Sequence, residues 1–423
     1  MKELAICIPT CNRAEEIKKI LEAEALPFME MKVDIIIYDS SLDYRVKHQV
    51  YQFINNGFNN VYYYKINVEK ESWEKVFDIY KAMQDSQYKY VWMIHDHTMI
   101  KKEAIEKILM YLKLNGDFYF LKMHGVNFES KRYVNINDFC KEHAWSLTRF
   151  GTAILNIDRF IKKTNWNKIY NIYEKKEYKN FSHVGYYLER FYQVPDLIIY
   201  SIEIPHQFCV DITRYRPLSW EDNNLIICCE YWTKTIMRLS SEYYNINMKK
   251  QIIKTQNKNM LNTYNLIKLK ERKLYGFKLY MHIKTWLNLV QPNCRLKNFF
   301  IAGTPVSILN TILNFYVRRK IFLKKRSYGN VVIYGAGRYA NAFADSLLKR
   351  EIEFDAFIVD SVNDNPSVLL NHNVYEAEWY LKRNSAYIII AIASSGIDEV
   401  KKNIEDFNKF GNKLEYVYFS ELI

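Results

Sequence analysis

Two apolar segments near the N-terminus constrain the fold more than any other feature, because each ends abruptly in a polar loop. Residues 4–8 and 33–38 are apolar enough to form strands that are buried on both faces. Between them, Ile17, Ile20 and Leu21 recur at helical spacing. Strand, helix and strand in this order predict a parallel β-α-β unit, whose strands end at one edge of a sheet. Ligands of such sheets bind beyond that edge, so we expect a binding site there.

The alternation of strands and helices continues to about residue 220 and returns near the C-terminus. The stretch between these parts lacks strand patterns and is rich in Lys, Arg and Asn. We therefore predict an α/β protein in three parts: a mostly parallel domain (1–220), a helical basic and aromatic region (221–328), and a small Rossmann-like domain (329–423). Further strands are expected at 61–65, 90–94, 118–123, 197–204, 331–334, 355–359, 387–393 and 414–419, and helices at 71–83, 102–112, 182–193 and 222–239.

Composition narrows the class of protein. The chain of 423 residues has 49% hydrophobic and 25% charged residues, which is typical of a folded protein. A net charge of +13 favours an anionic partner or reflects a coding bias toward Lys, and no nucleic-acid-binding motif accompanies it. The seven cysteines include no Cys-x-x-Cys pair, and no signal peptide is seen. Together these features predict a cytoplasmic protein that does not bind nucleic acid.

The two polar loops carry side chains suited to a nucleotide. A carboxylate can accept hydrogen bonds from a base or a ribose, and an arginine near a helix N-terminus favours phosphate. A glycine-rich basic loop, typical of nucleotidyltransferases, does not follow the first strand, so that class remains only as an alternative. The candidate nucleotide-binding residues are Pro9, Thr10, Asn12 and Arg13 after the first strand, and Asp39, Ser41 and Asp43 after the second.

These loops resemble those of the family 2 glycosyltransferases, which have a GT-A fold. The stretch 6–13 (ICIPTCNR) is similar to the first family motif, and 38–43 (YDSSLD) to the second, with Tyr38 in place of Asp and Ser40 in place of Gly. The resemblance covers about the first 210 residues. It implies an inverting transfer of a sugar from a nucleotide donor, with a UDP-sugar as the leading candidate. The implied acceptor is a saccharide or a polyprenyl-linked lipid, in the synthesis of bacterial surface glycans.

The resemblance also implies a divalent metal, Mn or Mg, held by an Asp-x-Asp motif after the strand at 90–94. This chain has His95, Asp96 and His97 there instead. His95 and Asp96 are expected to contact the donor, and the expected metal ligands are Asp96, His97 and His206. Imidazole beside carboxylate suits Mn, Zn or Fe better than Mg or Ca. Two alternatives stay open: a metal-free site in which a histidine binds the diphosphate, and a structural His-Asp pair.

An inverting transfer needs a base that takes the proton of the acceptor hydroxyl. The family places an acidic pair, followed by an arginine, on a helix late in the domain. In this chain Arg190 holds the arginine position on the helix at 182–193, and His183 stands where the acidic pair is expected. His183 is therefore the first candidate base, with Glu189 and Asp211 as alternatives.

The C-terminal part contains a glycine turn between a strand and a helix. Gly335, Gly337 and Ala340 form this turn, and Asp360 ends the next strand, as in a dinucleotide-binding fingerprint. About 95 residues are too few for two mononucleotide halves. The expectation is an accessory module that binds a nucleotide or a sugar, with an NAD-dependent oxidoreductase and a turn without ligand as alternatives.

A basic and aromatic stretch, residues 277–326, precedes this module. Its most apolar part, 299–317, is short and polar for a membrane span. Two interpretations remain open: an amphipathic anchor that contacts the inner face of a membrane peripherally, and core helices that join two domains.

Overall fold

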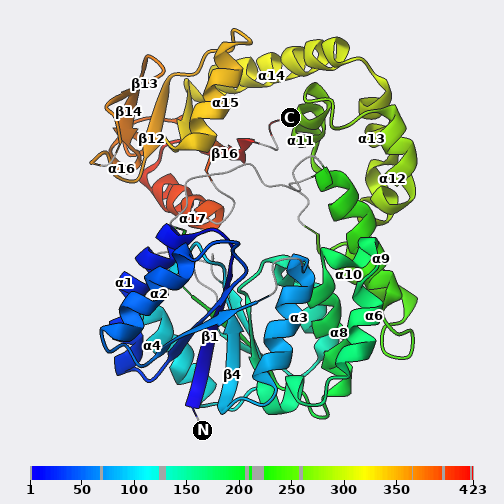
Figure 1. The fold of residues 1–423 in the computed structure, drawn as a ribbon. Helices are drawn as coiled ribbons and strands as arrows, with labels where there is room; N and C mark the ends of the chain where they lie inside the picture. Colours follow the sequence, from blue (N-terminus) through cyan, green and yellow to red (C-terminus); the bar gives the residue numbers. More distant parts are fainter. Residues whose placement is uncertain are drawn as a thin grey trace. The chain divides into compact units, whose positions relative to one another are not determined.

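The computed structural model describes residues 2–66, 70–122, 130–204, 209–211, 223–256, 261–363, 365–392, 396–419 and 422. The chain divides into two compact units (Figure 1). The first consists of Met1–Gln256 with Ile283–Asn293, and the second of Asn257–His282 with Cys294–Ile423. Each unit contains its own β-sheet.

The sheet of the first unit has eight strands in the order β3-β2-β1-β4-β8-β6-β9-β7. The first four are parallel, β8 runs antiparallel between β4 and β6, and β7 is antiparallel to β9. A separate ribbon pairs β5 with β10. The strands are β1 (Lys2–Thr10), β2 (Asp34–Asp39), β3 (Val61–Lys65), β4 (Tyr88–Met93), β5 (Thr98–Ile100), β6 (Phe118–Lys122), β7 (Lys131–Tyr133), β8 (Ala153–Asn156), β9 (Ile199–Glu203) and β10 (Cys209–Asp211).

Helices cover both faces of this sheet (Figure 1). Helices α1, α2 and α4 pack together on one face, and α3, α6 and α8 pack on the other, where Phe77 contacts Trp166 and Tyr186. The apolar runs of β1 and β2 are buried throughout their centres, as expected for strands covered on both sides. The helices are α1 (Ala14–Glu30), α2 (Arg45–Asn55), α3 (Ser72–Met83), α4 (Lys102–Leu112), α5 (Ile136–His143), α6 (Trp166–Tyr173), α7 (Lys176–Lys179), α8 (Ser182–Gln193), α9 (Trp232–Arg238) and α10 (Ile246–Ile253).

The second unit contains a six-stranded sheet in the order β13-β14-β12-β11-β15-β16, parallel except at the β13 edge. Its strands are β11 (Asn330–Tyr334), β12 (Ala356–Val359), β13 (Val368–Leu369), β14 (His372–Glu376), β15 (Ala386–Ile390) and β16 (Leu414–Tyr418). Its helices are α11 (Thr263–Glu271), α13 (Arg295–Gly303), α14 (Val306–Tyr328), α15 (Arg338–Leu348), α16 (Ala377–Leu381) and α17 (Ile397–Phe407). Helix α12 (Phe277–Val290) has residues in both units.

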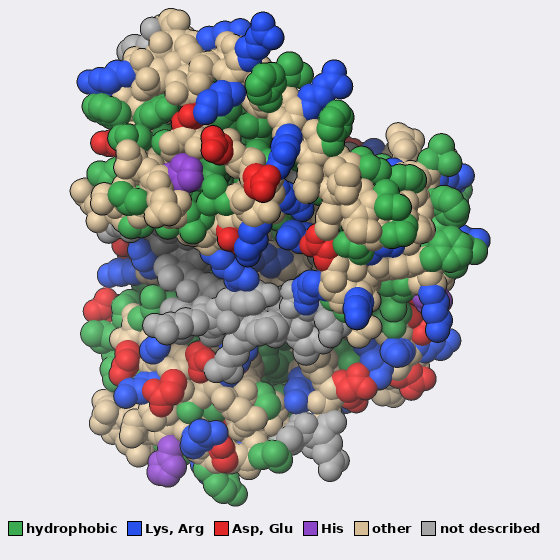
Figure 2. Space-filling view, turned by 90° about the horizontal axis from the view of Figure 1, so that it is seen from above, with side chains coloured by type: hydrophobic (Ala, Val, Ile, Leu, Met, Phe, Trp, Pro, Cys, Tyr) green, Lys and Arg blue, Asp and Glu red, His purple; other side chains and the backbone are tan. Residues whose placement is uncertain are grey.

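The predicted α/β fold class is confirmed, and β3, α4 and α8 begin and end at the predicted residues. The helix predicted at 222–239 is observed as a π-helical segment, Ile226–Tyr231, followed by α9. Strand β14 was not predicted, because it is short and only partly buried and so has no apolar run. Among the described residues, no helix is long and apolar enough to span a bilayer. Lys and Arg side chains are prominent on the face seen in Figure 2.

Candidate functional site

The strand order places a topological switch point, here called the crevice, at the carboxyl ends of β1 and β4. From β1 the chain moves outward through β2 to β3, and then returns to the other side of β1 as β4. The connection that leaves β1 and the connection that enters β4 therefore run to opposite sides of the boundary between these two strands. Open α/β sheets bind ligands at such a switch point. The polar loops that follow β1, β2 and β4 all lie at this edge, as the sequence predicted for the first two.

The loops after β1 and β2 are joined by hydrogen bonds. The backbone N–H of Ser40 donates to the carbonyl of Thr10 at 2.9 Å, and the N–H of Asn12 donates to Oγ of Ser41 at 2.8 Å. Asn12 has a φ of 57°, a left-handed conformation that asparagine tolerates better than most residues. The turn after Pro9 is thus held in a single arrangement against the β2 loop.

Asp39 lies at the end of β2 and is fully buried. Its Oδ1 accepts from the N–H of Ser41 at 2.7 Å, and its Oδ2 accepts from the hydroxyl of Tyr63 at 2.7 Å and from Nζ of Lys65 at 3.3 Å. Burial, followed by the bond to this carboxylate, raises the pKa of Tyr63. The sequence analysis missed both partners from β3, although Lys65 stands opposite Asp39 in the parallel register.

Asp96 connects the β4 loop to the β1 loop. Its Oδ2 accepts from the Thr10 hydroxyl at 3.0 Å and lies 3.4 Å from Nε of Arg13, while its Oδ1 lies 3.4 Å from Nδ1 of His97. The rings of His95 and His97 are stacked, with centroids 4.6 Å apart. One carboxylate thus holds a guanidinium and an imidazole at the crevice, an arrangement suited to a diphosphate.

Beyond the imidazole–carboxylate pair of Asp96 and His97, the described residues do not complete a metal site. Nowhere in the described part of the chain do three His, Cys, Asp or Glu side chains gather in a way that could hold an ion. Arg13 already provides a positive charge at the same carboxylate. His206, the third predicted ligand, lies outside the described residues.

His183 lies in the first turn of α8, with its ring between the rings of Phe150 (6.2 Å) and Tyr187 (5.9 Å). Phe150 also contacts the ring of His95 at 4.9 Å, so one aromatic ring links His183 to the β4 loop. Burial lowers the pKa of His183 to about 4, and its Nε2 has no hydrogen-bond partner among the described residues. The imidazole is therefore neutral at neutral pH.

The other two candidate bases are in different surroundings. Glu189 forms an ion pair with Arg238 at 2.9 Å, and the same guanidinium donates to the hydroxyl of Tyr173 at 2.7 Å. This pairing gives Glu189 a structural role between α8 and α9. Asp211 belongs to β10, which pairs with β5 directly after the β4 loop, but its side chain is not among those described.

The low pKa of His183 predicts a loss of stability in acid. An unfolded histidine binds a proton near pH 6.5, whereas folded His183 binds one only near pH 4. The contribution of neutral His183 to the free energy of unfolding is therefore complete above pH 6.5, and it is lost as the pH falls toward 4. We expect the free energy of unfolding to fall by about 2 kcal/mol between about pH 7 and pH 5 for this reason. Urea unfolding at both pH values would measure the fall.

In the same experiment, His183→Gln should remove this part of the pH dependence. The matched control is His48→Gln, because His48 is exposed on α2 and should leave the pH dependence unchanged. An NMR titration that placed the pKa of His183 near 6.5 would contradict the prediction.

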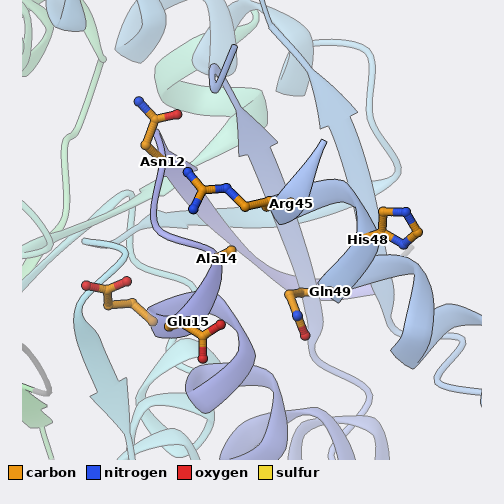
Figure 3. Close-up of a pocket in the computed structure, with 7 residues that line it drawn as sticks. Asn12, Ala14, Glu15, Arg45, His48 and Gln49 are labelled. Atoms are coloured by element: carbon orange, nitrogen blue, oxygen red, sulfur yellow. The ribbon is translucent and has the colours of Figure 1, made fainter. Parts of the chain in front are cut away.

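An open cavity of about 440 Å³ adjoins the β1 loop (Figure 3). The turn into α1 lines one side, and the first turns of α2 line the other. Arg45 reaches into it beside Asn12 and also pairs with Asp43 at 2.8 Å, and hydrogen bonds from Arg45 lower the pKa of Asp43. The sequence analysis missed Arg45 and His48, because nothing marks them before α1 and α2 are placed side by side. The lining residues are Asn12, Ala14, Glu15, Glu16, Arg45, His48 and Gln49.

In the second unit, Gly335 and Gly337 form the turn between β11 and α15, and Ala340 lies in the first turn of α15. Gly335 has a φ of 111°, and a Cβ there would lie 2.8 Å from a methyl carbon of Ile392, so the turn requires glycine. Asp360 follows β12 and accepts a hydrogen bond from the Tyr334 hydroxyl. This turn lies at the switch point of the sheet, between β12 and β15.

No protein-family model and no curated protein matches the sequence. Among solved structures, residues 1–349 of Staphylococcus aureus TarS share 14% identity at a TM-score of 0.44, over 71% of this chain and 86% of that chain. The mannosyltransferase PcManGT from Pyrobaculum calidifontis, in complex with GDP-Man and Mn2+, shares 13% at 0.38, over 71% and 85%. Glucosyl-3-phosphoglycerate synthase from Mycobacterium tuberculosis, in complex with Mn2+, UDP and phosphoglyceric acid, shares 11% at 0.37, over 56% and 78%. These are distant likenesses, and no residue role is taken from them.

Proposed function

We propose that the first unit is a glycosyltransferase that moves a sugar from a nucleotide donor to a saccharide or lipid-linked acceptor. A UDP-sugar is the leading candidate for the donor. The observation that supports this most is the meeting of three polar loops at the β1/β4 switch point, where Asp96 holds Thr10 and Arg13. A nucleotide diphosphate combines a base, a ribose and a charged leaving group, and these loops offer acceptors and cations for all three.

In the proposed reaction, the bond between the sugar and the diphosphate breaks as the acceptor oxygen bonds to the sugar. Negative charge then develops on the departing diphosphate. Arg13 and His97 stand beside Asp96, and their N–H groups would stabilise that charge, since hydrogen-bond donors already in place act strongly at a partly buried site. Asp96 would act by keeping both groups oriented toward the crevice.

The acceptor hydroxyl must lose its proton in the same reaction. We propose His183 as the base, because its imidazole is neutral and its Nε2, although buried, has no partner among the described side chains. With a pKa of about 4 it is a weak base, so the proton would move only as the glycosidic bond forms. Glu189 would first have to break its ion pair with Arg238, and so it ranks behind His183 as the base.

Thermal unfolding with nucleotides would test the proposed donor class. At about a hundred times Kd, a ligand of the folded state adds about 2.7 kcal/mol, so we expect UDP or its sugars to raise the melting temperature by about 5 °C or more. GDP, CDP and their sugars serve as matched ligands, each with and without Mn2+. If no nucleoside diphosphate changes the melting temperature, the proposed function is wrong.

The same experiment separates the alternatives. Stabilisation by a nucleoside triphosphate, with release of pyrophosphate, would indicate a nucleotidyltransferase. Stabilisation by NAD(H) would indicate that the glycine turn at Gly335 binds a dinucleotide, for which the doubly wound strand order of the second unit is the supporting observation.

A further inference from the structure

Helix α14 has apolar residues on two opposite sides, and only one side is covered. Leu309, Leu313, Val317 and Ile321 recur every four residues and are buried, and the helix packs on α11, β11 and β15. The opposite side of the helix is exposed to solvent. Because an α-helix turns by about 100° per residue, the apolar residues of this side fall on one face. Its apolar residues are Ile308 (49% exposed), Ile312 (50%), Phe315 (68%) and Phe322 (67%).

Helix α13, which precedes α14 in the same unit, repeats this pattern. Leu296, Phe299 and Phe300 are exposed and lie three and four residues apart, so they form one face of the helix. Ile301 and Ala302 on its other side are buried. Exposed phenylalanines at this density are unusual for a surface that meets only water, and mark an interaction site.

The charged side chains that this segment itself carries have one sign. Residues 277–328 contain ten Lys and Arg and no Asp or Glu. Three of the ten hold α14 to its own unit: Arg318, Lys324 and Lys325 form ion pairs with Glu351, Glu415 and Asp355.

Two of the ten cations, Arg319 and Arg326, share the exposed face of α14. Each stands four residues after a phenylalanine of that face, Phe315 and Phe322 respectively. Neither forms an ion pair or a side-chain hydrogen bond with a described residue. The outward face of α14 therefore presents aromatic side chains and unpaired arginines together.

We propose that the outward faces of α13 and α14, here called the basic apolar face, dock on an anionic lipid bilayer. Apolar side chains that enter the boundary between headgroups and acyl chains gain hydrophobic stabilisation, and adjacent arginines bind anionic headgroups. A second copy of this chain fits the face poorly. A twofold contact would bring like charges together, with no carboxylate in 277–328 to pair them. This inference does not depend on the proposed function of the first unit.

Sedimentation of the full chain with vesicles tests the proposal. We expect the protein to bind vesicles of phosphatidylcholine with phosphatidylglycerol, to bind pure phosphatidylcholine much less, and to dissociate as salt is added. Phe315→Ser with Phe322→Ser, and separately Arg319→Glu with Arg326→Glu, should each lower the partition coefficient by about tenfold or more. All four side chains are exposed, so the variants should unfold at the temperature of the original chain.

Matched controls carry the same chemical changes elsewhere. Met110→Ser with Leu114→Ser replaces exposed apolar residues of the first unit, and Lys349→Glu with Lys409→Glu makes the same change in net charge. Both controls should bind vesicles as the original chain does. Absence of vesicle binding, or equal binding by all variants, would overturn the proposal. So would a dimer in light scattering that the Phe315→Ser and Phe322→Ser changes abolish, because a second copy would then cover the face.

Discussion

Replacing Asp96 by asparagine is expected to lower the rate of sugar transfer by about a hundredfold or more, with a small change in melting temperature. The amide keeps the size of the side chain and removes the charge that holds Arg13 and His97 at the crevice. Loss of one preorganised electrostatic contact typically costs about 10²–10³ in rate. Donor hydrolysis and transfer, measured at saturating UDP-sugar, would give the ratio.

Two further variants sharpen this test. Asp85→Asn makes the same chemical change at an exposed turn before β4, and should leave the rate unchanged. Thr10→Val removes only the hydroxyl that donates to Asp96, and should lower the rate by about tenfold. If Asp96→Asn turns over donor like the original chain, Asp96 has no part in the mechanism.

Asp39→Asn is expected both to destabilise the fold and to weaken stabilisation by nucleotides, because Asp39 holds the β2 loop through the N–H of Ser41. Both carboxylate oxygens accept hydrogen bonds. In one orientation the amide NH2 of the asparagine would face the N–H of Ser41, and in the other it would face the Tyr63 hydroxyl and the Lys65 ammonium, so a donor would meet a donor in either case. Leaving such a buried group unsatisfied costs about 2–3 kcal/mol. Urea unfolding would measure this cost, and thermal unfolding with UDP would measure the loss of binding.

The chain contains a matched control on the same strand. Asp34 lies at the other end of β2, is also buried, and is bonded to a lysine and a tyrosine, Lys2 and Tyr88. Asp34→Asn should therefore destabilise the fold to a similar degree without affecting nucleotide binding. If Asp39→Asn retains the full thermal shift with UDP, Asp39 does not position the β2 loop for the donor. If both variants lose the shift, the loss reflects damage to the sheet.

The sequence predicted the class of fold well, because parallel strands buried on both faces leave uninterrupted apolar runs such as 4–8 and 33–38. It also predicted that the β1 and β2 loops meet, since their shared edge follows from the parallel β-α-β unit. The partners of Asp39 on β3 were missed, because contacts across strands depend on register, which no local pattern encodes. The low pKa of His183 was likewise missed, because its burial comes from Phe150 and Tyr187, which are distant from each other in the sequence.

The interleaved order of the two units has a practical consequence for any attempt to express one of them alone. The first unit needs residues 283–293, which follow a stretch that belongs to the second. A gene fragment ending at codon 256 would omit Ile283, Leu287 and Val290, all buried in the complete chain, and would uncover whatever they pack against. Such a fragment is expected to aggregate, so a soluble fragment of the first unit would have to extend through residue 293.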